Sequence, residues 1–434
     1  MHQNLMYMKK ILFVIVAILT LSACSKKDDP EPAPGPTPVN QHTVLVYMAG
    51  ENNLSHSYDS STRKYYSCLD MDLSEMIEGS YQLADNQHLI AFVDSTGSRN
   101  YPHIYEIAGG KATEVYRYSS DFYSSDPDKF REIIQWTIDN YPSDDYALVL
   151  WGHATGWAIS TDTIAQSPSK SRAYGIDQGT DITGGSTHWM NITQMARALD
   201  GLPKFRYIFA DCCCFQCIES AYELRKAAGY LIGSPAEIPD LGAPYDKIVP
   251  ALFSQSADFY KQICDVYYDY YFDQYQLSEN ASLGLSGYSV PMSAIDLSQM
   301  DNLASATATA MRSFMPQSPE ELDLSLMPFY FDYDKPVMYD VKSVFHQYAP
   351  ETAYTQWLKA YDAAVPYQLP SLKWLTIYNA IKNRFNLFPS DASEWGCTSM
   401  FFPQATYAYA TFRYNQRISL LQWYNAVNWS AYGW

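Results

Sequence analysis

Four cysteines crowd the segment "ADCCCFQCIE": Cys212, Cys213, Cys214 and Cys217. A zinc site needs a second pair of thiolates, or histidines at a distance, whereas Cys214 and Cys217 form a single C-x-x-C. The same C-x-x-C also fits a thiol–disulfide exchange pair. Buried packing thiols and a single catalytic thiolate are the two other interpretations. Residue type and spacing alone leave these alternatives open.

The catalytic interpretation depends on position in the predicted fold. Asp211 to Cys214 lie at the carboxyl end of a predicted strand, where the reactive groups of open α/β sheets gather. We expect the next helix to begin there and to stabilise a thiolate with its unpaired amides and its dipole. A base is also required, and among the eight histidines only His153 follows directly after a buried strand, in the Gly-containing loop "GHATGW". His153 is therefore the candidate base.

Strands and helices alternate through the middle of the chain. Apolar strands are predicted at 44–48, 88–95, 146–151, 204–214 and 230–235, a hairpin at 104–118, and helices at 126–141, 191–201 and 217–229. Alternating helices and apolar strands predict a mainly parallel sheet covered on both faces. After residue 240 the pattern becomes long, Tyr-rich and helical. A late strand at 397–403 is predicted to return to the sheet.

Composition and charge narrow the class of protein. The chain has 434 residues, of which 47% are hydrophobic and 18% charged, as expected for a folded globular protein. Its formal net charge of −18 repels phosphate backbones, so nucleic acid is excluded as a partner. A cationic or neutral substrate fits this charge better.

The N-terminus carries an export signal. Lys9 and Lys10 precede the apolar run 11–23, which is too short to span a bilayer and reads as a secretory signal. "LSAC" resembles the lipobox of bacterial lipoproteins, in which the cysteine, here Cys24, becomes lipidated; a plain signal peptide is the alternative. A Pro-rich tether follows. Its "KKDD" resembles a surface-sorting signal, so we expect lipid anchoring to the bacterial outer membrane, with the protein exposed at the surface.

Several motifs together resemble the clostripain-like cysteine peptidases, which are relatives of caspases, legumains and gingipains. The likeness spans nearly all of residues 43–434 and is carried by "TVLVYMAGENNL", "DPDKFREIIQWTIDNYPSDDYALVLWGHATGW", "FADCCCFQCIESAYEL", "SAIDLSQMDNLA" and "GCTSMFFP". The resemblance implies a caspase-like three-layer α/β/α sandwich with a helical C-terminal part. The resulting domain boundaries are 1–23 for the lipoprotein signal peptide, 24–41 for the tether, 42–290 for the peptidase core, and 291–434 for a C-terminal region that packs on and completes the core.

The resemblance also assigns catalytic roles. In this family the nucleophile lies two residues after an Asp and eight before the Ala of Ala-Tyr-Glu-Leu. Counting from Asp211 and from Ala221 selects Cys213 in both cases. His153 matches the catalytic histidine. Ala154 replaces the glycine that normally follows it; the backbone amides of Ala154 and Cys213 are expected to form the oxyanion hole, although a positive φ would strain an alanine.

Substrate and processing sites follow from the same resemblance. An acidic pocket that binds a basic side chain, preferably Arg, matches Asp211, with Asp240 as a second candidate wall. Lys170 and Arg172 are candidate self-cleavage sites in a Ser-rich loop. The reaction requires no cofactor, no metal site is expected among the cysteines, and the family leaves room for a structural Ca²⁺. The expected partners are a peptide or protein substrate and the membrane. The rival function is a non-catalytic surface lipoprotein that binds glycan or protein on a decayed peptidase fold.

Overall fold

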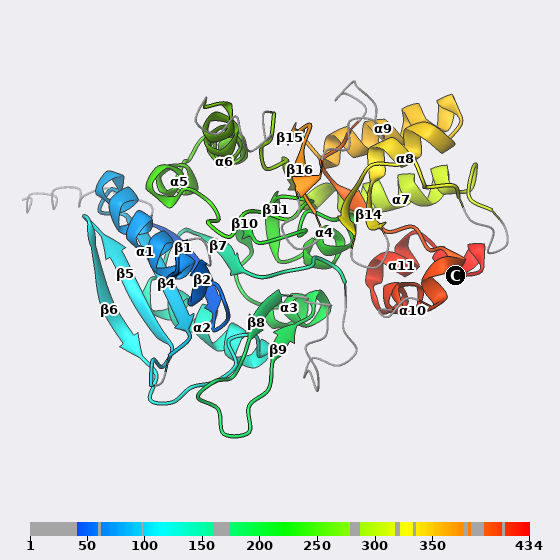
Figure 1. Cartoon of the computed structure of the whole chain (residues 1–434). Coiled ribbons are helices and arrows are strands. Elements are labelled where there is room, and N and C mark those ends of the chain that lie inside the picture. The colour runs from blue at the N-terminus through cyan, green and yellow to red at the C-terminus, as the bar shows by residue number, and fades with distance from the viewer. Residues whose placement is uncertain are drawn as a thin grey trace, which may run out of the picture. The chain divides into compact units, whose positions relative to one another are not determined.

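A nine-stranded sheet organises the protein, with strands in the order β15-β12-β11-β10-β7-β1-β4-β5-β6. The computed structural model describes residues 41–59, 62–97, 99–158, 174–277, 287–316, 322–332, 336–376, 381–382, 395–409 and 413–434. β11, β10, β7, β1 and β4 are parallel, and the outer strands on both sides join antiparallel (Figure 1). The bounds are β1 His42–Gly50, β4 Gln87–Ser95, β5 His103–Ala108, β6 Lys111–Arg117, β7 Asp145–Gly152, β10 Phe205–Asp211, β11 Ala228–Gly233, β12 Met292–Asp296 and β15 Tyr367–Leu369.

Helices cover both faces of this sheet. Successive side chains of a strand point to opposite faces, so in β1 Leu45 and Tyr47 enter one core while Val44 and Val46 enter the other. α2, α3 and α4 pack on the Leu45 face, and α1, α5 and α6 pack on the Val44 face. The predicted three-layer α/β/α sandwich is thereby confirmed. The bounds are α1 Cys68–Gly79, α2 Pro127–Asn140, α3 Ile192–Leu199, α4 Ile218–Leu224, α5 Tyr245–Leu252 and α6 Phe259–Gln276.

α2 shows how local sequence fixes an element. The Asp126 carboxylate accepts bonds from the amides of Asp128 and Lys129, which caps the free amides of the first turn. Pro127 occupies the first turn, where a missing N–H costs nothing. Ile133 is among the residues that face the core. The predicted helix and its start are confirmed.

The predicted end of the helix at 217–229 is wrong. α4 ends at Leu224 instead of running to Gly229, and β11 already begins at Ala228. Ala228 pairs with Phe205 of β10, and a Cβ at position 229 would lie 2.8 Å from the Arg206 carbonyl oxygen. Residues 228–229 therefore belong to a strand that pairs with its neighbour, and local sequence does not reveal that pairing.

The prediction for 397–403 is also wrong. β18 (Ser399–Met400) pairs with β14 (Pro336–Asp340), which pairs with β13 (Phe329–Asp332) in a separate three-stranded sheet. The edge of the central sheet is taken by β15 instead, and the Ser399 amide donates to the Gln216 carbonyl at 3.1 Å. The late segment therefore crosses the cysteine loop.

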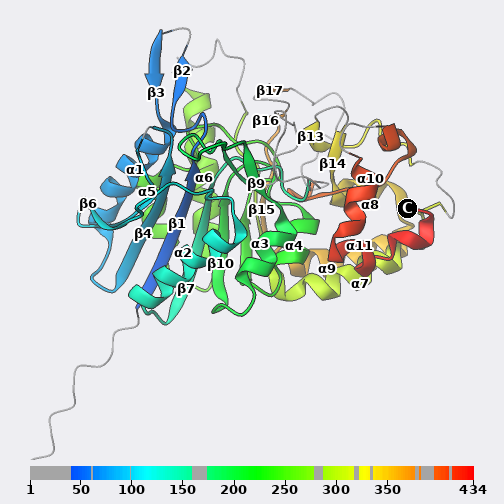
Figure 2. The same cartoon turned by 90° about the horizontal axis from the view of Figure 1, so that it is seen from below.

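The remaining elements lie around the core. The C-terminal part is largely helical, and the β2–β3 hairpin projects from the same edge of the molecule along which β13, β14, β16 and β17 lie (Figure 2). Bounds are β2 Ser57–Asp59, β3 Lys64–Tyr66, β8 Tyr174–Asp177, β9 His188–Met190, β16 Trp374–Leu375, β17 Ile381–Lys382, α7 Met300–Met311, α8 Val341–Tyr348, α9 Glu351–Ala364, α10 Tyr414–Arg417 and α11 Gln422–Ala426.

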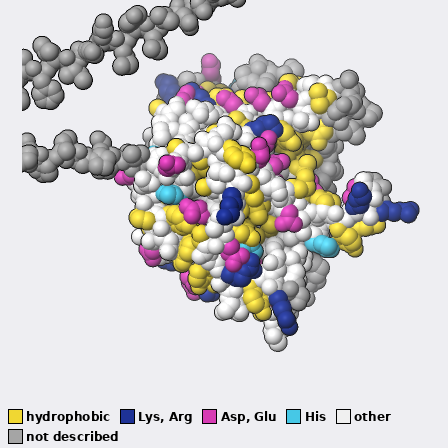
Figure 3. All heavy atoms as spheres, turned by 90° about the vertical axis from the view of Figure 1, so that its left-hand side faces the viewer, with side chains coloured by type: hydrophobic (Ala, Val, Ile, Leu, Met, Phe, Trp, Pro, Cys, Tyr) yellow, Lys and Arg dark blue, Asp and Glu magenta, His cyan; other side chains and the backbone are white. Residues whose placement is uncertain are grey.

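Surface and helix properties agree with the composition. On the face that carries α1, β5 and β6, acidic, basic and apolar side chains are interspersed, and its described residues form no continuous basic patch (Figure 3). Within the described part of the chain, no helix has both the length and the apolarity needed to cross a membrane.

Candidate active site

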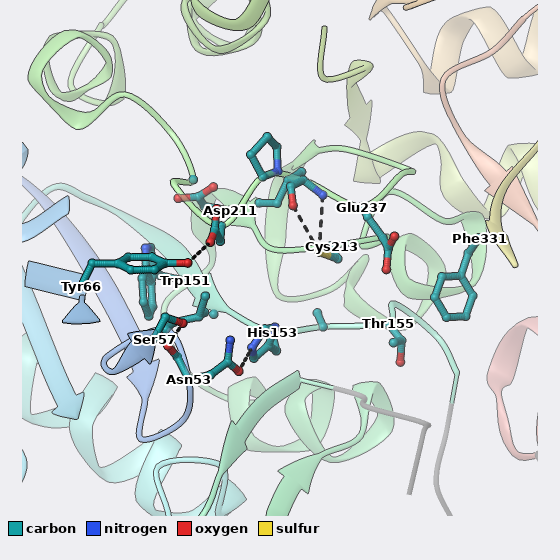
Figure 4. A pocket seen from close by; sticks show the side chains of 17 residues that line it. Asn53, Ser57, Tyr66, Trp151, His153, Thr155, Asp211, Cys213, Glu237 and Phe331 are labelled. Atoms are coloured by element: carbon teal, nitrogen blue, oxygen red, sulfur yellow. Dashed lines mark hydrogen bonds between the residues drawn. The ribbon is translucent and has the colours of Figure 1, made fainter. Parts of the chain in front are cut away.

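The pairing of β7 with β10 brings the two candidate catalytic residues together. Trp151 pairs with Asp211 in parallel register, so His153 and Cys213 each lie two residues beyond one paired row. Neighbouring strands are about 4.8 Å apart, which places both residues at one point of the carboxyl edge. Both line the same cleft, and Figure 4 shows them on its facing sides.

Loops from distant parts of the sequence form this cleft of about 370 Å³. The β1 loop and the β2–β3 hairpin supply one wall, the loops after β7 and β10 supply the reactive residues, and the segment after β11 supplies another wall. The lining residues are Asn53, Leu54, Ser57, Tyr66, Trp151, Gly152, His153, Ala154, Thr155, Asp211, Cys213, Glu237, Ile238, Pro239, Asp240, Gly242 and Phe331.

The sulfur of Cys213 is held by the segment after β11. The amide of Ile238 donates to Sγ at 3.4 Å, and Sγ can donate as a thiol to the Ile238 carbonyl at 3.9 Å. The expected contact with a helix N-terminus is wrong, because α4 begins only at Ile218 and helix-terminal effects fall off within one turn. A backbone amide from another strand's loop stabilises negative charge on the sulfur instead.

A tight turn separates Cys213 from α4. Cys214 adopts φ +57°, and its amide donates to the Ala236 carbonyl at 2.8 Å, so this amide is occupied. Gly156 packs against the turn: a Cβ there would lie 2.3 Å from the Cys214 oxygen and 2.9 Å from Sγ of Cys217. Gly156 itself has φ +54°, which suits glycine. The histidine loop and the cysteine loop are thus locked together.

The neighbouring cysteines are buried packing groups. Cys212, Cys214 and Cys217 are buried free thiols, each 0% exposed. Burial raises the pKa of the Cys217 thiol to about 12 and that of Cys212 well above its usual value. A zinc or redox site needs thiolates, so this environment disfavours both for the C-x-x-C. The described residues offer no metal-ligand cluster that contains a cysteine.

Asn53 orients His153, and the sequence did not reveal it. The Asn53 side-chain oxygen lies 2.8 Å from Nε2 of His153 and accepts a hydrogen bond from it in the tautomer that carries the proton on Nε2. Asn53 lies within the opening motif, but nothing local marks it.

The expected strain at Ala154 is wrong, because Ala154 is not among the described residues with positive φ.

Asp211 lies at the floor of the cleft. It is 2% exposed and accepts bonds from the hydroxyls of Tyr245 at 2.8 Å and Tyr267 at 2.9 Å, and from the Ala243 amide at 3.1 Å. Burial raises the pKa of this carboxyl, and the three donors oppose part of that rise. Three donors on one carboxylate are the environment of an ionised group.

A second buried carboxyl, Asp72, lies beside it and was missed by sequence analysis. Trp151 Nε1 donates to Asp72 at 2.5 Å, and burial followed by repulsion from Asp211 raises the pKa of Asp72 to about 9. A Cβ on Gly242 would stand 2.9 Å from an oxygen of Asp211 and 3.2 Å from one of Asp72. The absent side chain therefore leaves the cleft open toward both acids.

The other predicted residues lie at the rim or outside the described residues. Asp240 is exposed and accepts a bond from the Tyr66 hydroxyl at 3.0 Å, while Glu237 lines the cleft beside Cys213 (Figure 4). Tyr66 and Glu237 carried no sequence signal. The candidate cleavage sites Lys170 and Arg172, the candidate lipidation site Cys24 and residues 24–40 of the predicted tether lie outside the described residues.

Comparisons with known proteins identify the class of protein that this fold and cleft define. A model of the clostripain family matches residues 46–434, so the chain belongs to that family and is a cysteine-type peptidase. Its substrates are accordingly peptides or proteins. A model of the prokaryotic membrane lipoprotein lipid attachment site matches residues 8–25, so the protein is lipid-anchored to a membrane.

Solved structures agree with this assignment. A secreted C11 cysteine protease from Bacteroides thetaiotaomicron in complex with an irreversible peptide inhibitor is 26% identical, with TM-score 0.71 over 90% of this chain and 99% of the other. An inactive zymogen C11 protease from Parabacteroides distasonis is 23% identical (TM-score 0.69, 90% and 99%). Iotapain, a secreted C11 cysteine protease from Bacteroides thetaiotaomicron, is 19% identical (0.68, 90% and 100%). The last two share the fold. No curated protein matches the chain.

The contact of Gly156 with the cysteine loop gives a stability prediction. Gly156→Ala should lower the free energy of unfolding by about 2 kcal/mol or more beyond the cost of its positive φ, because its Cβ overlaps the Cys214 oxygen. Gly109→Ala is the matched control: Gly109 has φ +56°, and a Cβ added there would meet nothing within 4 Å. Urea denaturation of both variants measures the difference. Equal destabilisation would show that the contact does not constrain the loops.

Proposed function

We propose that the protein is a cysteine endopeptidase that uses a His153/Cys213 dyad and cleaves after basic residues, preferably Arg. The observation that carries the proposal is the shared register row of β7 and β10, which directs one imidazole and one thiol into one cleft. The structure that shares 26% identity over 90% of this chain holds an irreversible peptide inhibitor, which supports covalent chemistry on a peptide.

In this mechanism the Cys213 thiolate attacks the scissile carbonyl carbon. The new C–S bond moves the carbonyl electrons onto oxygen, and the amides of Ala154 and Cys213 stabilise that oxyanion. Collapse of the intermediate breaks the C–N bond as His153 gives a proton to the leaving amine. Water, deprotonated by His153, then hydrolyses the thioester. The steps require no cofactor.

Specificity for Arg follows from the acids at the floor. A bound guanidinium would reach Asp211 past Gly242. Its positive charge would stabilise the ionised carboxylate, which burial destabilises. A planar guanidinium forms paired N–H···O bonds with a carboxylate, while Lys offers a single point charge. Asp240 would contribute less, because it is exposed and screened by water.

Processing, location and metal binding complete the proposal. Self-cleavage would occur at Lys170 or Arg172, and a relative with the same fold is described as an inactive zymogen. Lipid on Cys24 and the tether 24–41 would place the peptidase core 42–290, completed by 291–434, on the outer face of the outer membrane. A structural Ca²⁺ is compatible with the chemistry, since it takes no part in the steps above.

The dyad predicts which cysteine reacts. Cys213→Ala and His153→Ala should each lower kcat/KM by at least about 10⁴-fold, the scale of losing a nucleophile or its base. Cys212→Ala, which removes a buried thiol next to the nucleophile, should keep most of the activity. Mass spectrometry after treatment with a peptidyl electrophile should find label on Cys213 alone. Full turnover by purified Cys213→Ala would refute the assignment.

Asn53 is proposed as a positioning residue for the imidazole. Asn53→Ala should lower kcat/KM by about 10-fold to 100-fold, since small displacements of a catalytic group have costs of this size. Asn53→Asp should move the limb of the pH–rate profile that reports the imidazole to higher pH, because an adjacent carboxylate favours its charged form. Asn140→Asp, exposed on α2, is the control. Unchanged profiles in both Asn53 variants would exclude this role.

Asp211 is predicted to determine specificity. Wild type should cleave reporter peptides with Arg before the cut fastest, then Lys, then Leu. Asp211→Asn should reduce the Arg-to-Leu ratio of kcat/KM by about 10-fold to 100-fold, the value of a hydrogen bond to a charged group. Asp240→Asn should reduce it less, and Asp246→Asn, on α5, serves as the control. An Arg preference that survives in Asp211→Asn would remove Asp211 from the pocket.

A further inference from the structure

A cluster of buried carboxylates lies at the carboxyl edge of the sheet, apart from the catalytic cleft. Glu51 follows β1, Asp94 lies near the end of β4, and Asp177 ends β8. One carboxylate oxygen of each lies within 4.8 Å of the other two, and all three residues are at most 2% exposed. They come from separate parts of the sequence, so tertiary folding alone assembles them.

Two of the three carboxylates have buried oxygens without a hydrogen-bond partner. Asp177 is satisfied, since the Ser124 amide donates to it at 2.7 Å and the Gly179 amide at 2.8 Å. Glu51 accepts from the Thr180 amide at 2.6 Å through one oxygen, while its other oxygen accepts none. Neither oxygen of Asp94 accepts a hydrogen bond of good geometry, although the Ser124 hydroxyl, which donates to Asp177 at 3.0 Å, lies close enough to lower the pKa of Asp94. A fully buried carboxylate with both oxygens unpaired carries a large desolvation cost.

Within the described part of the chain, no lysine or arginine forms an ion pair that would relieve this cost. None of the ion pairs among the described residues includes Glu51, Asp94 or Asp177. A further carboxylate, Asp121, also has a buried oxygen without a partner and adds to the repulsion at Asp94. Two agents can neutralise such a group, namely protons or a bound cation.

We propose that Glu51, Asp94 and Asp177 bind one Ca²⁺ ion. Ca²⁺ takes oxygen ligands at about 2.3–2.6 Å, so two of its ligands lie at most about 5 Å apart, and these three oxygens lie within 4.8 Å of one another. Asp94 can bind through both oxygens, Glu51 through its unpaired oxygen, and Asp121 or water can complete the shell. Mg²⁺ fits less well, because it demands a near-octahedral shell and retains several waters.

The pKa values of the three carboxyls reflect the cost of burying them together. Burial and then interaction with Asp177 raise the pKa of Glu51 to about 8, and burial and then repulsion from Asp94 raise the pKa of Asp177 to about 7. Burial also raises the pKa of Asp94 well above its usual value. These carboxylates are costly to ionise together without a counter-ion, and a divalent cation would supply that charge.

The site is connected to the catalytic loop through two residues of backbone. Asn53 stands two residues after Glu51 and bonds His153 at 2.8 Å. The Gln178 amide also donates to the Glu51 carbonyl at 2.9 Å, which links the β8 end to this loop. A cation on Glu51 would therefore hold the loop that orients the imidazole, but its binding does not depend on the proposed peptidase mechanism.

Calorimetric titration of the EDTA-stripped, purified protein with CaCl₂ tests the site. Wild type should bind one Ca²⁺, more tightly than Mg²⁺, and its Tm should rise with added CaCl₂. Asp94→Asn and Glu51→Gln should each weaken binding at least about tenfold, as changes around metal sites do. In EDTA, Asp94→Asn should be at least as stable as wild type, because it removes a buried, unpaired charge. Asp85→Asn, exposed before the same strand, should behave as wild type.

Hydrogen exchange supplies a local readout. The amides of Ser124, Gly179 and Thr180 donate to the cluster and should exchange more slowly in Ca²⁺ than in EDTA, in wild type but not in Asp94→Asn. The proposal is overturned if wild type binds no Ca²⁺, if Asp94→Asn and Glu51→Gln bind it unchanged, or if Mg²⁺ binds more tightly. The first of these results would mean that protons neutralise the cluster.

Discussion

The register of β7 against β10 is the constraint on which the site depends. Because Trp151 pairs with Asp211, the residues two positions further on come out side by side at the carboxyl edge. Side chains alternate between faces along a strand. A slip of one residue in the pairing would therefore point His153 and Cys213 to opposite faces of the sheet. Both strands are buried between two helical layers, and their side chains pack alternately into two different cores, so a slip would force both cores to repack. The catalytic geometry is therefore secured by the same packing that stabilises the fold.

Loops beyond these strands would still be free to move without cross-links. Gly156 fits against the Cys214 carbonyl, the Cys214 amide bonds Ala236, and Ile238 contacts the Cys213 sulfur. The late segment at Ser399 crosses the same turn, which explains why it does not extend the central sheet. A cysteine loop held from three directions keeps its sulfur in place without help from a helix N-terminus.

Acidic groups at the carboxyl edge divide into two sets with different surroundings. Asp72 and Asp211 receive bonds from tryptophan, tyrosine and backbone donors and face the cleft past Gly242. Glu51 and Asp94 keep buried oxygens without a hydrogen-bond partner, and neither residue lines the cleft. The first set suits a substrate cation that enters and leaves, and the second suits a cation that stays.

The sequence by itself determined the alternating strands and helices, the export signal, and His153 and Cys213 as candidates, because apolar periodicity, capping residues and short motifs are local properties. Tertiary structure alone decided the partners of these residues. Asn53 contacts His153 from 100 positions away, Asp72 reaches Trp151 across 79, and the cluster of Glu51 is assembled from three separate segments of the chain. The same reason explains the misplaced end of α4 and the misplaced late strand. Strand pairing and side-chain contact across the sheet are properties of the packed chain, and no local pattern encodes them.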